Sequence, residues 1–205
     1  NFDAFLHLVQ LDSLNLADNL LDRPGMIFNS SANFPTLRVL SLRVNRLTEI
    51  DPELFHKFVN LATINLEHNQ ITAVPPTTFS TMTKLTTLNF YENRLTELPA
   101  NLLSSNTELN IIDIRDNQIA QLHPDTFKGL AKVTRIFLNN NPITYFDPTT
   151  FRDTVSLQRL LLGACELSNL DPAMFSTLRN LVIMDLYSNN LETFPSDAKL
   201  TNLTS

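Results

Sequence analysis

Apolar residues recur along the chain at a fixed spacing. The stretches LATINLEHNQI (61–71), LTTLNFYENRL (85–95) and LNIIDIRDNQI (109–119) are apolar at their first, fourth, sixth and eleventh positions. The same four positions are apolar in eight units, which identifies an internal repeat. One interval between successive units is 26 residues and the other six are 24. The units begin at residues 11, 37, 61, 85, 109, 133, 157 and 181.

Each repeat divides into a strand and a return segment. Apolar positions 4 and 6 alternate with mostly polar neighbours, and this period of two predicts a short strand with one buried face. The second half often carries a proline, as in Asp51-Pro52 and Leu98-Pro99, which disfavours continuing the strand. An apolar residue at position 19 then predicts a segment pinned to the core: Phe55, Phe79, Leu103, Phe127, Phe151 and Phe175. One unit cannot bury its apolar residues alone, so neighbouring units must stack around a continuous core.

The repeat pattern LxxLxLxxNxLxxLPxxxFxxLxx resembles the leucine-rich repeat. Its 24-residue length and position-19 aromatic are similar to the type found in extracellular proteins such as Toll receptors, axon-guidance factors and small proteoglycans. The resemblance covers nearly the whole chain, so we treat 1–205 as one leucine-rich repeat domain. It implies an α/β repeat solenoid, a horseshoe of about eight repeats with a parallel sheet on the concave face. It also implies a partner bound by the concave or lateral face.

The two ends of the chain depart from the family pattern. Residues 1–10 match the back half of a repeat whose strand is missing. Neither end carries the cysteine-rich caps that family members use to cover the exposed core. We therefore expect a partial span of a longer ectodomain.

Composition argues against several classes of function. The net charge of -6 and pI near 5.1 disfavour a nucleic-acid partner, which needs clustered Lys and Arg. The longest apolar runs are far shorter than the ~20 residues of a membrane helix, so we expect no membrane insertion by this span. The four histidines do not pair at ligand spacing, and three glycines make no phosphate loop. We expect no catalytic residues, no cofactor and no enzymatic activity.

Position 9 places a polar residue inside the apolar pattern. A row of amides has two interpretations: a ligand track, or side chains that pair backbone groups of adjacent turns, which we favour. In the seventh unit this position holds Cys165, the only cysteine, where burial raises a thiol's pKa and makes it unreactive. The predicted ladder is Asn19, Asn45, Asn69, Asn93, Asn117, Asn141, Cys165 and Asn189.

Position 8 aligns three residue types that bind metals. His68, Glu92 and Asp116 belong to successive units, with strands roughly 5 Å apart. A metal site and a solvated polar edge are the two interpretations, and we favour the polar edge.

Positions 2, 3, 5, 7 and 8 are predicted to face outward from the strands. In the N-terminal half they are mostly polar, with charges of both signs interspersed: Ser41, Arg43, Asn65, Glu67, Asn89, Tyr91, Glu92, Asp113, Arg115 and Asp116. In the C-terminal half Phe137 and Leu161 occupy position 5, where water-facing polar residues are expected. Gly163 and Ala164 lack side-chain bulk, which predicts a shallow dent beside Leu161.

These apolar residues have two interpretations. In one, the stems of Arg135 and Arg159 cover them. In the other they form an anchor for a protein partner, flanked by arginines. The hypothetical partner-binding set is Tyr91, Arg115, Arg135, Phe137, Arg159, Leu161, Ile183 and Tyr187.

Two glycosylation acceptors bear on the compartment. Asn29-Ser30-Ser31 and Asn202-Leu203-Thr204 match the N-x-[ST] motif. Together with the resemblance, they favour a secreted protein or cell-surface ectodomain. We expect a recognition module of a Toll-like receptor or secreted immune protein, bound to a protein ligand or co-receptor. The alternative is an adhesion or matrix-organising protein that self-associates, for example as a homodimer.

Overall fold

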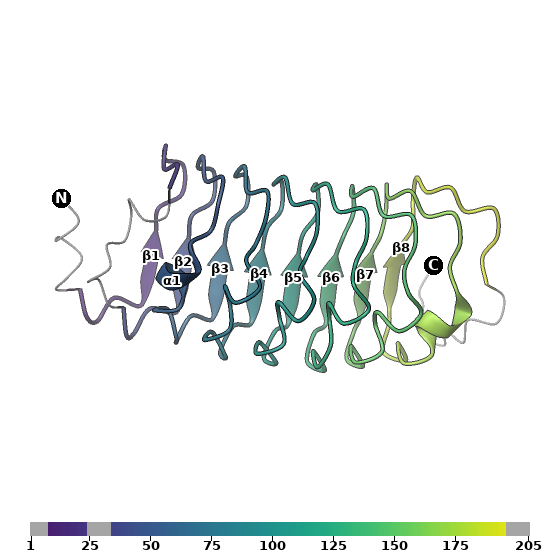
Figure 1. Ribbon diagram of the computed structural model, residues 1–205. Helices are drawn as coiled ribbons and strands as arrows, with labels where there is room; N and C mark the ends of the chain where they lie inside the picture. Colours follow the sequence, from purple (N-terminus) through teal and green to yellow (C-terminus); the bar gives the residue numbers. More distant parts are fainter. Residues whose placement is uncertain (1–7, 24–33, 196–205) are drawn as a thin grey trace.

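The repeats stack into a solenoid with one parallel sheet, as the computed structural model shows for residues 8–23 and 34–195 (Figure 1). The sheet has eight strands in chain order, and every neighbouring pair is parallel and in register. Equivalent repeat positions therefore lie side by side. The predicted fold class is confirmed. The strands are β1 (Ser13–Asn15), β2 (Val39–Ser41), β3 (Thr63–Asn65), β4 (Thr87–Asn89), β5 (Ile111–Asp113), β6 (Arg135–Phe137), β7 (Arg159–Leu161) and β8 (Ile183–Asp185).

The return side of the solenoid is mostly turns. Its regular elements among the described residues are the helix α1 (Pro52–Phe55) and the 3-10 helix η3 (Pro172–Phe175). Both begin at an Asp-Pro pair. Asp51 and Asp171 each accept a hydrogen bond from the backbone N–H two residues later, at 3.0 and 2.8 Å, and so cap the helix.

The core runs continuously between the sheet and the return segments. Position-19 rings pack along it, and Phe127 and Phe151 stack with their centroids 5.6 Å apart. Each repeat covers the apolar residues of its neighbours, so the outermost strands are less buried. Leu14 of β1 and Met184 of β8 are half-buried, whereas Ile112 of β5 is fully buried. Stability therefore depends on contacts between adjacent repeats.

Every strand is followed by a left-handed residue at position 8. The φ angles lie between 50° and 59° in all eight repeats. Residues other than glycine rarely adopt this conformation, and β-branched Val44 is the most unusual case. No glycine marks the position, so the repeat pattern does not predict the turn. The residues are Asp18, Val44, His68, Glu92, Asp116, Asn140, Ala164 and Ser188.

Candidate functional site

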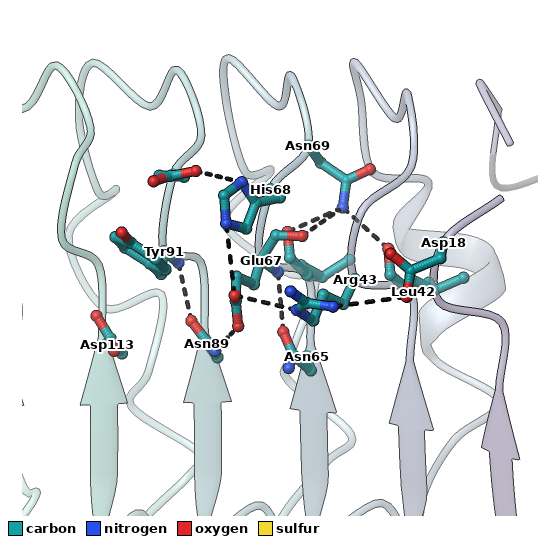
Figure 2. Close-up of polar contacts among 12 residues, drawn as sticks. Asp18, Leu42, Arg43, Asn65, Glu67, His68, Asn69, Asn89, Tyr91 and Asp113 are labelled. Carbon is teal, nitrogen blue, oxygen red and sulfur yellow. Dashed lines mark hydrogen bonds and ion pairs between the residues drawn. The ribbon is translucent and has the colours of Figure 1, made fainter. Parts of the chain in front are cut away.

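The position-9 amides form a hydrogen-bonded ladder at the strand ends, and Figure 2 shows Asn69 as one member of it. Asn69 is typical: its Nδ2 donates to the carbonyls of Leu42 and Leu66, at 3.0 Å each. Its Oδ1 accepts from the backbone N–H of Leu47 in the preceding repeat, also at 3.0 Å. The amide thus pairs backbone groups of two repeats, and its hydrogen bonds are used within the protein.

Cys165 occupies the ladder position of the seventh repeat. Cys165 is 4% exposed as a residue, and its Sγ lies 3.6 Å from the carbonyl oxygen of Leu138. Burial raises the pKa of Cys165 to about 11, so the thiol is neutral at physiological pH. The N–H of Ile143, which an asparagine here would pair, donates instead to the carbonyl of Asn141 at 2.7 Å. These features are those of a structural residue and not of a nucleophile.

A network of ion pairs crosses the N-terminal half of the sheet face, by which we mean the outward side of the eight strands (Figure 2). Arg43 bridges Asp18 and Glu67, with nitrogen–oxygen distances of 3.5 and 3.1 Å. Glu67 also accepts from Asn89 Nδ2 at 3.2 Å, and His68 pairs with both Glu67 and Glu92. Arg43 and His68 are thus each in contact with two carboxylates of this network.

The position-8 column divides between separate pairs. His68 contacts Glu92, whereas Asp116 accepts a hydrogen bond from Asn140 Nδ2 at 2.8 Å. Within 8–23 and 34–195, no group of three His, Cys, Asp or Glu side chains is placed to hold a metal ion. The geometry is that of a polar edge.

Arg115 ends this network on its C-terminal side. Its Nε and Nη2 donate to the two carboxylate oxygens of Asp113, at 2.9 and 2.6 Å. The guanidinium also lies 4.7 Å from the ring centroid of Tyr91 and 5.4 Å from that of Phe137. The hydrogen bond to Asp113 is the main cause that raises the pKa of Arg115. The prediction that Asp113 is exposed is wrong: it is 7% exposed, in a paired contact with Arg115.

Phe137 and Leu161 lie side by side on β6 and β7, and both are half-buried. The arginine over Phe137 is Arg115, while Arg135 and Arg159 are exposed. On β8, Ile183 follows Arg159 in register and is half-buried. The structure therefore places the predicted partner-binding residues on the adjacent strands β6 to β8 or just after the strands β4, β5 and β8.

The predicted dent beside Leu161 is wrong. Gly163 is buried because the ring of Tyr187, from the next repeat, lies against it. A Cβ at position 163 would overlap the atoms Cδ1 and Cε1 of that ring. Tyr187 remains 52% exposed. The missing side chain of Gly163 thus makes room for an exposed aromatic ring.

Position 5 has a second role that the repeat pattern did not reveal. In five repeats its side chain accepts a hydrogen bond from the backbone N–H two residues later. Asn89, for example, accepts from the N–H of Tyr91 at 2.8 Å. Phe137 and Leu161 have no such acceptor. The N–H groups of Asn139 and Gly163 have no hydrogen-bond partner among the described residues. The run of Asn and Asp at position 5 was the available signal for this capping role.

Two features bear on the compartment. The predicted glycosylation sites Asn29 and Asn202 lie outside the described residues. In the part of the chain that the structure describes, no helix has the length and apolar character to cross a bilayer.

A family model described as leucine rich repeat matches three overlapping segments of the chain. They are residues 35–95, 59–119 and 107–167, and together they cover more than half of the 205 residues. No curated protein sequence matches the chain.

Solved structures share this fold. A chain of the Drosophila Toll–Spatzle complex is 25% identical with a TM-score of 0.70, covering 91% of this chain and 28% of its own length. A chain of the octameric complex of latrophilin 3, Unc5D and FLRT2 is 22% identical with a TM-score of 0.76, covering 97% and 67%. An internalin of Listeria monocytogenes is 23% identical with a TM-score of 0.72, covering 99% and 63%. The chain thus spans little more than a quarter of the Toll–Spatzle match.

Proposed function

The chain belongs to the leucine-rich repeat family, and we propose that it is a non-enzymatic protein-recognition module whose partner docks on the C-terminal half of the sheet face. One observation carries this proposal. Phe137, Leu161 and Tyr187 form an apolar group on a face whose N-terminal half is mostly polar and carries ion pairs such as Arg43 with Glu67. Clustered aromatic and aliphatic side chains of this kind are typical anchors of protein interfaces.

The two halves of the sheet face differ in what a partner gains from binding. On the N-terminal half, a partner must desolvate or displace ion pairs such as Arg43 with Glu67, which costs free energy. On the C-terminal half, it covers apolar surface at about 25 cal/mol per Å². Tyr187 offers a large exposed ring there. Binding is therefore favoured at the C-terminal half.

We further propose that the module acts outside the cell, within an innate-immune receptor or a secreted immune protein. The 24-residue repeat type and the two acceptor motifs at Asn29 and Asn202 support this placement. The likeness to a chain of the Toll–Spatzle complex, described as a hub in development and innate immunity, supports it as well. The partner is then a protein ligand or co-receptor.

Capture from native extracellular fluid and from cell-surface extracts tests this function. The immobilised wild-type protein is expected to retain one defined protein. The double variant Phe137→Ala/Leu161→Ala is expected to bind that protein more than ~tenfold more weakly, because it loses the central anchor. The matched control is Thr63→Ala/Thr87→Ala, which changes outward positions in the N-terminal half and is expected to keep full affinity.

Two results would decide against the proposal. Unchanged affinity of the folded Phe137→Ala/Leu161→Ala variant, with an intact thermal transition, would rule out this anchor. A wild-type dimer in sedimentation that dissociates in the same variant would instead favour the self-associating alternative.

A further inference from the structure

Two arginines of neighbouring strands lie side by side, and no carboxylate of the described residues pairs with either. Arg135 and Arg159 are in register on β6 and β7, and both are exposed. Adjacent strands are ~4.8 Å apart, so the two positive charges repel one another. Among the described residues, neither guanidinium takes part in an ion pair or a side-chain hydrogen bond.

Five other cationic side chains of the described residues form ion pairs with carboxylates. Carboxylates are abundant in a chain with a net charge of -6, yet none of the described residues forms an ion pair with Arg135 or Arg159. The compensated pairs are Arg38 with Asp12, Arg43 with Asp18 and Glu67, Arg115 with Asp113, Lys132 with Glu108, and Arg152 with Asp125.

The arginine pair adjoins the apolar group. Positions 3 and 5 of a strand face the same side and are roughly 7 Å apart. Arg135 and Arg159 therefore form one row, and Phe137 and Leu161 form the next row across the same two strands. We call these four residues, with Tyr187, the arginine–apolar patch.

The apolar row lacks a hydrogen-bond acceptor that most other repeats have at position 5. Asparagine or aspartate at position 5 caps a backbone N–H in five other repeats. Ser41, Phe137 and Leu161 do not, and the N–H groups of Arg43, Asn139 and Gly163 have no hydrogen-bond partner among the described residues. The Oδ1 of Asn139 is also buried without a partner. The two arginines and the N–H groups of Asn139 and Gly163 thus belong to the same two repeats. Local deviations of this kind are typical of functional sites.

We propose that the partner presents an acidic segment to the arginine–apolar patch. Its carboxylates pair with Arg135 and Arg159, and a neighbouring apolar side chain packs on Phe137 and Leu161. This inference rests on the proposed function, since it describes the partner of the same site. Charge complementarity supports it: two exposed guanidinium groups fit carboxylates in bidentate geometry.

A protein segment fits the patch better than an anionic polymer. A sulfated polysaccharide has no apolar side chain to cover Phe137 and Leu161. A long polyanion would also extend beyond the two arginines over a protein with a net charge of -6, which repels it. A short segment with mixed acidic and apolar residues satisfies both rows.

Selection from a displayed library of random 12-residue peptides tests the inference. Peptides retained by the wild-type protein are expected to carry two or more Asp or Glu beside a bulky apolar residue. Synthetic copies are expected to bind more weakly as salt rises. Arg135→Glu/Arg159→Glu is expected to reduce their affinity at least ~tenfold.

Matched variants separate this inference from the proposed function. Arg46→Glu/Arg94→Glu makes the same change in net charge at exposed residues outside the strands and is expected to leave affinity unchanged. Peptides that depend on Phe137 and Leu161 but tolerate Arg135→Glu/Arg159→Glu would overturn the acidic segment and leave the proposed function standing. Peptides indifferent to both double variants would overturn both. Heparin binding that needs the arginines but not Phe137 and Leu161 would overturn the acidic protein segment.

Discussion

Cys165 replaces the amide in one rung of the ladder, and its surroundings show what the amide supplies. An asparagine at this position accepts an N–H from the preceding repeat, as Asn141 accepts that of Ile119 at 3.1 Å. The thiol is a weak donor and a poor acceptor, so the N–H of Ile143 turns to the nearby carbonyl of Asn141. The ladder therefore lacks, at Cys165, the hydrogen bond to the N–H of the preceding repeat.

Cys165→Asn is expected to stabilise the protein. The amide restores one acceptor and stronger donors, which corresponds to about 1 kcal/mol in the free energy of unfolding. Urea denaturation measures this difference. The control is Cys165→Ala, which is expected to be no more stable than the wild type. An asparagine variant less stable than the alanine variant would contradict the ladder role of the position.

At the scale of the strand, position 5 serves either the backbone or the surface. Asn65 and Asn89 cap the N–H two residues later, at 2.9 and 2.8 Å, and stay within the polar network. Leu161 leaves that N–H unpaired and contributes apolar surface instead. One side chain cannot both accept this hydrogen bond and present an apolar surface. At the ends of β6 and β7, Phe137 and Leu161 present apolar surface and leave the backbone N–H without a side-chain acceptor.

Leu161→Asn is expected to be more stable than Leu161→Ala by about 1 kcal/mol, because only asparagine can pair the N–H of Gly163. Chemical denaturation of the two variants checks this difference. Both variants are expected to lose partner affinity, since both remove the apolar side chain. Equal stability of the two would show that position 161 cannot cap its strand.

At the scale of the whole molecule, each repeat contacts its neighbours and little else. The strands follow chain order with constant register, and the buried rows continue from one repeat to the next. Stability is then approximately a sum of repeat and interface terms. The arginine–apolar patch lies in the repeats that contain β6, β7 and β8.

Deletion of residues 61–84, one whole repeat, is expected to leave a folded solenoid. The repeat beginning at Leu37 then joins the repeat beginning at Leu85, so every column keeps its register. The free energy of unfolding is expected to fall by about one repeat's share, and peptide affinity at the patch to stay within ~twofold. Circular dichroism, urea denaturation and peptide titration measure these results.

Deletion of 61–72, half a repeat, is the control. This deletion removes the half of the repeat that contains the strand and leaves its return segment. Equivalent positions of the flanking repeats then no longer align, so the variant is expected not to fold cooperatively. A cooperative transition in this variant, or loss of the fold on deletion of 61–84, would contradict the repeat model.

The repeat architecture was determined by the sequence itself. The strand positions, the stacking and the alignment of the position-9 column all follow from apolar periodicity, because each depends on residues within one repeat and on identical neighbours. The grouping of Phe137 and Leu161 also follows, since equivalent positions of adjacent repeats must lie side by side.

Tertiary structure alone decided how the side chains pair. Arg115 binds Asp113 and covers Phe137, whereas Arg135 and Arg159 stay exposed, although all three are arginines on or beside the same sheet. Tyr187 fills the space at Gly163, where the sequence predicted a dent. These outcomes depend on side-chain conformations and on the neighbours that each group meets across repeats. A repeat pattern predicts which residues occupy equivalent positions of adjacent repeats, but it does not predict which of their charged side chains form ion pairs.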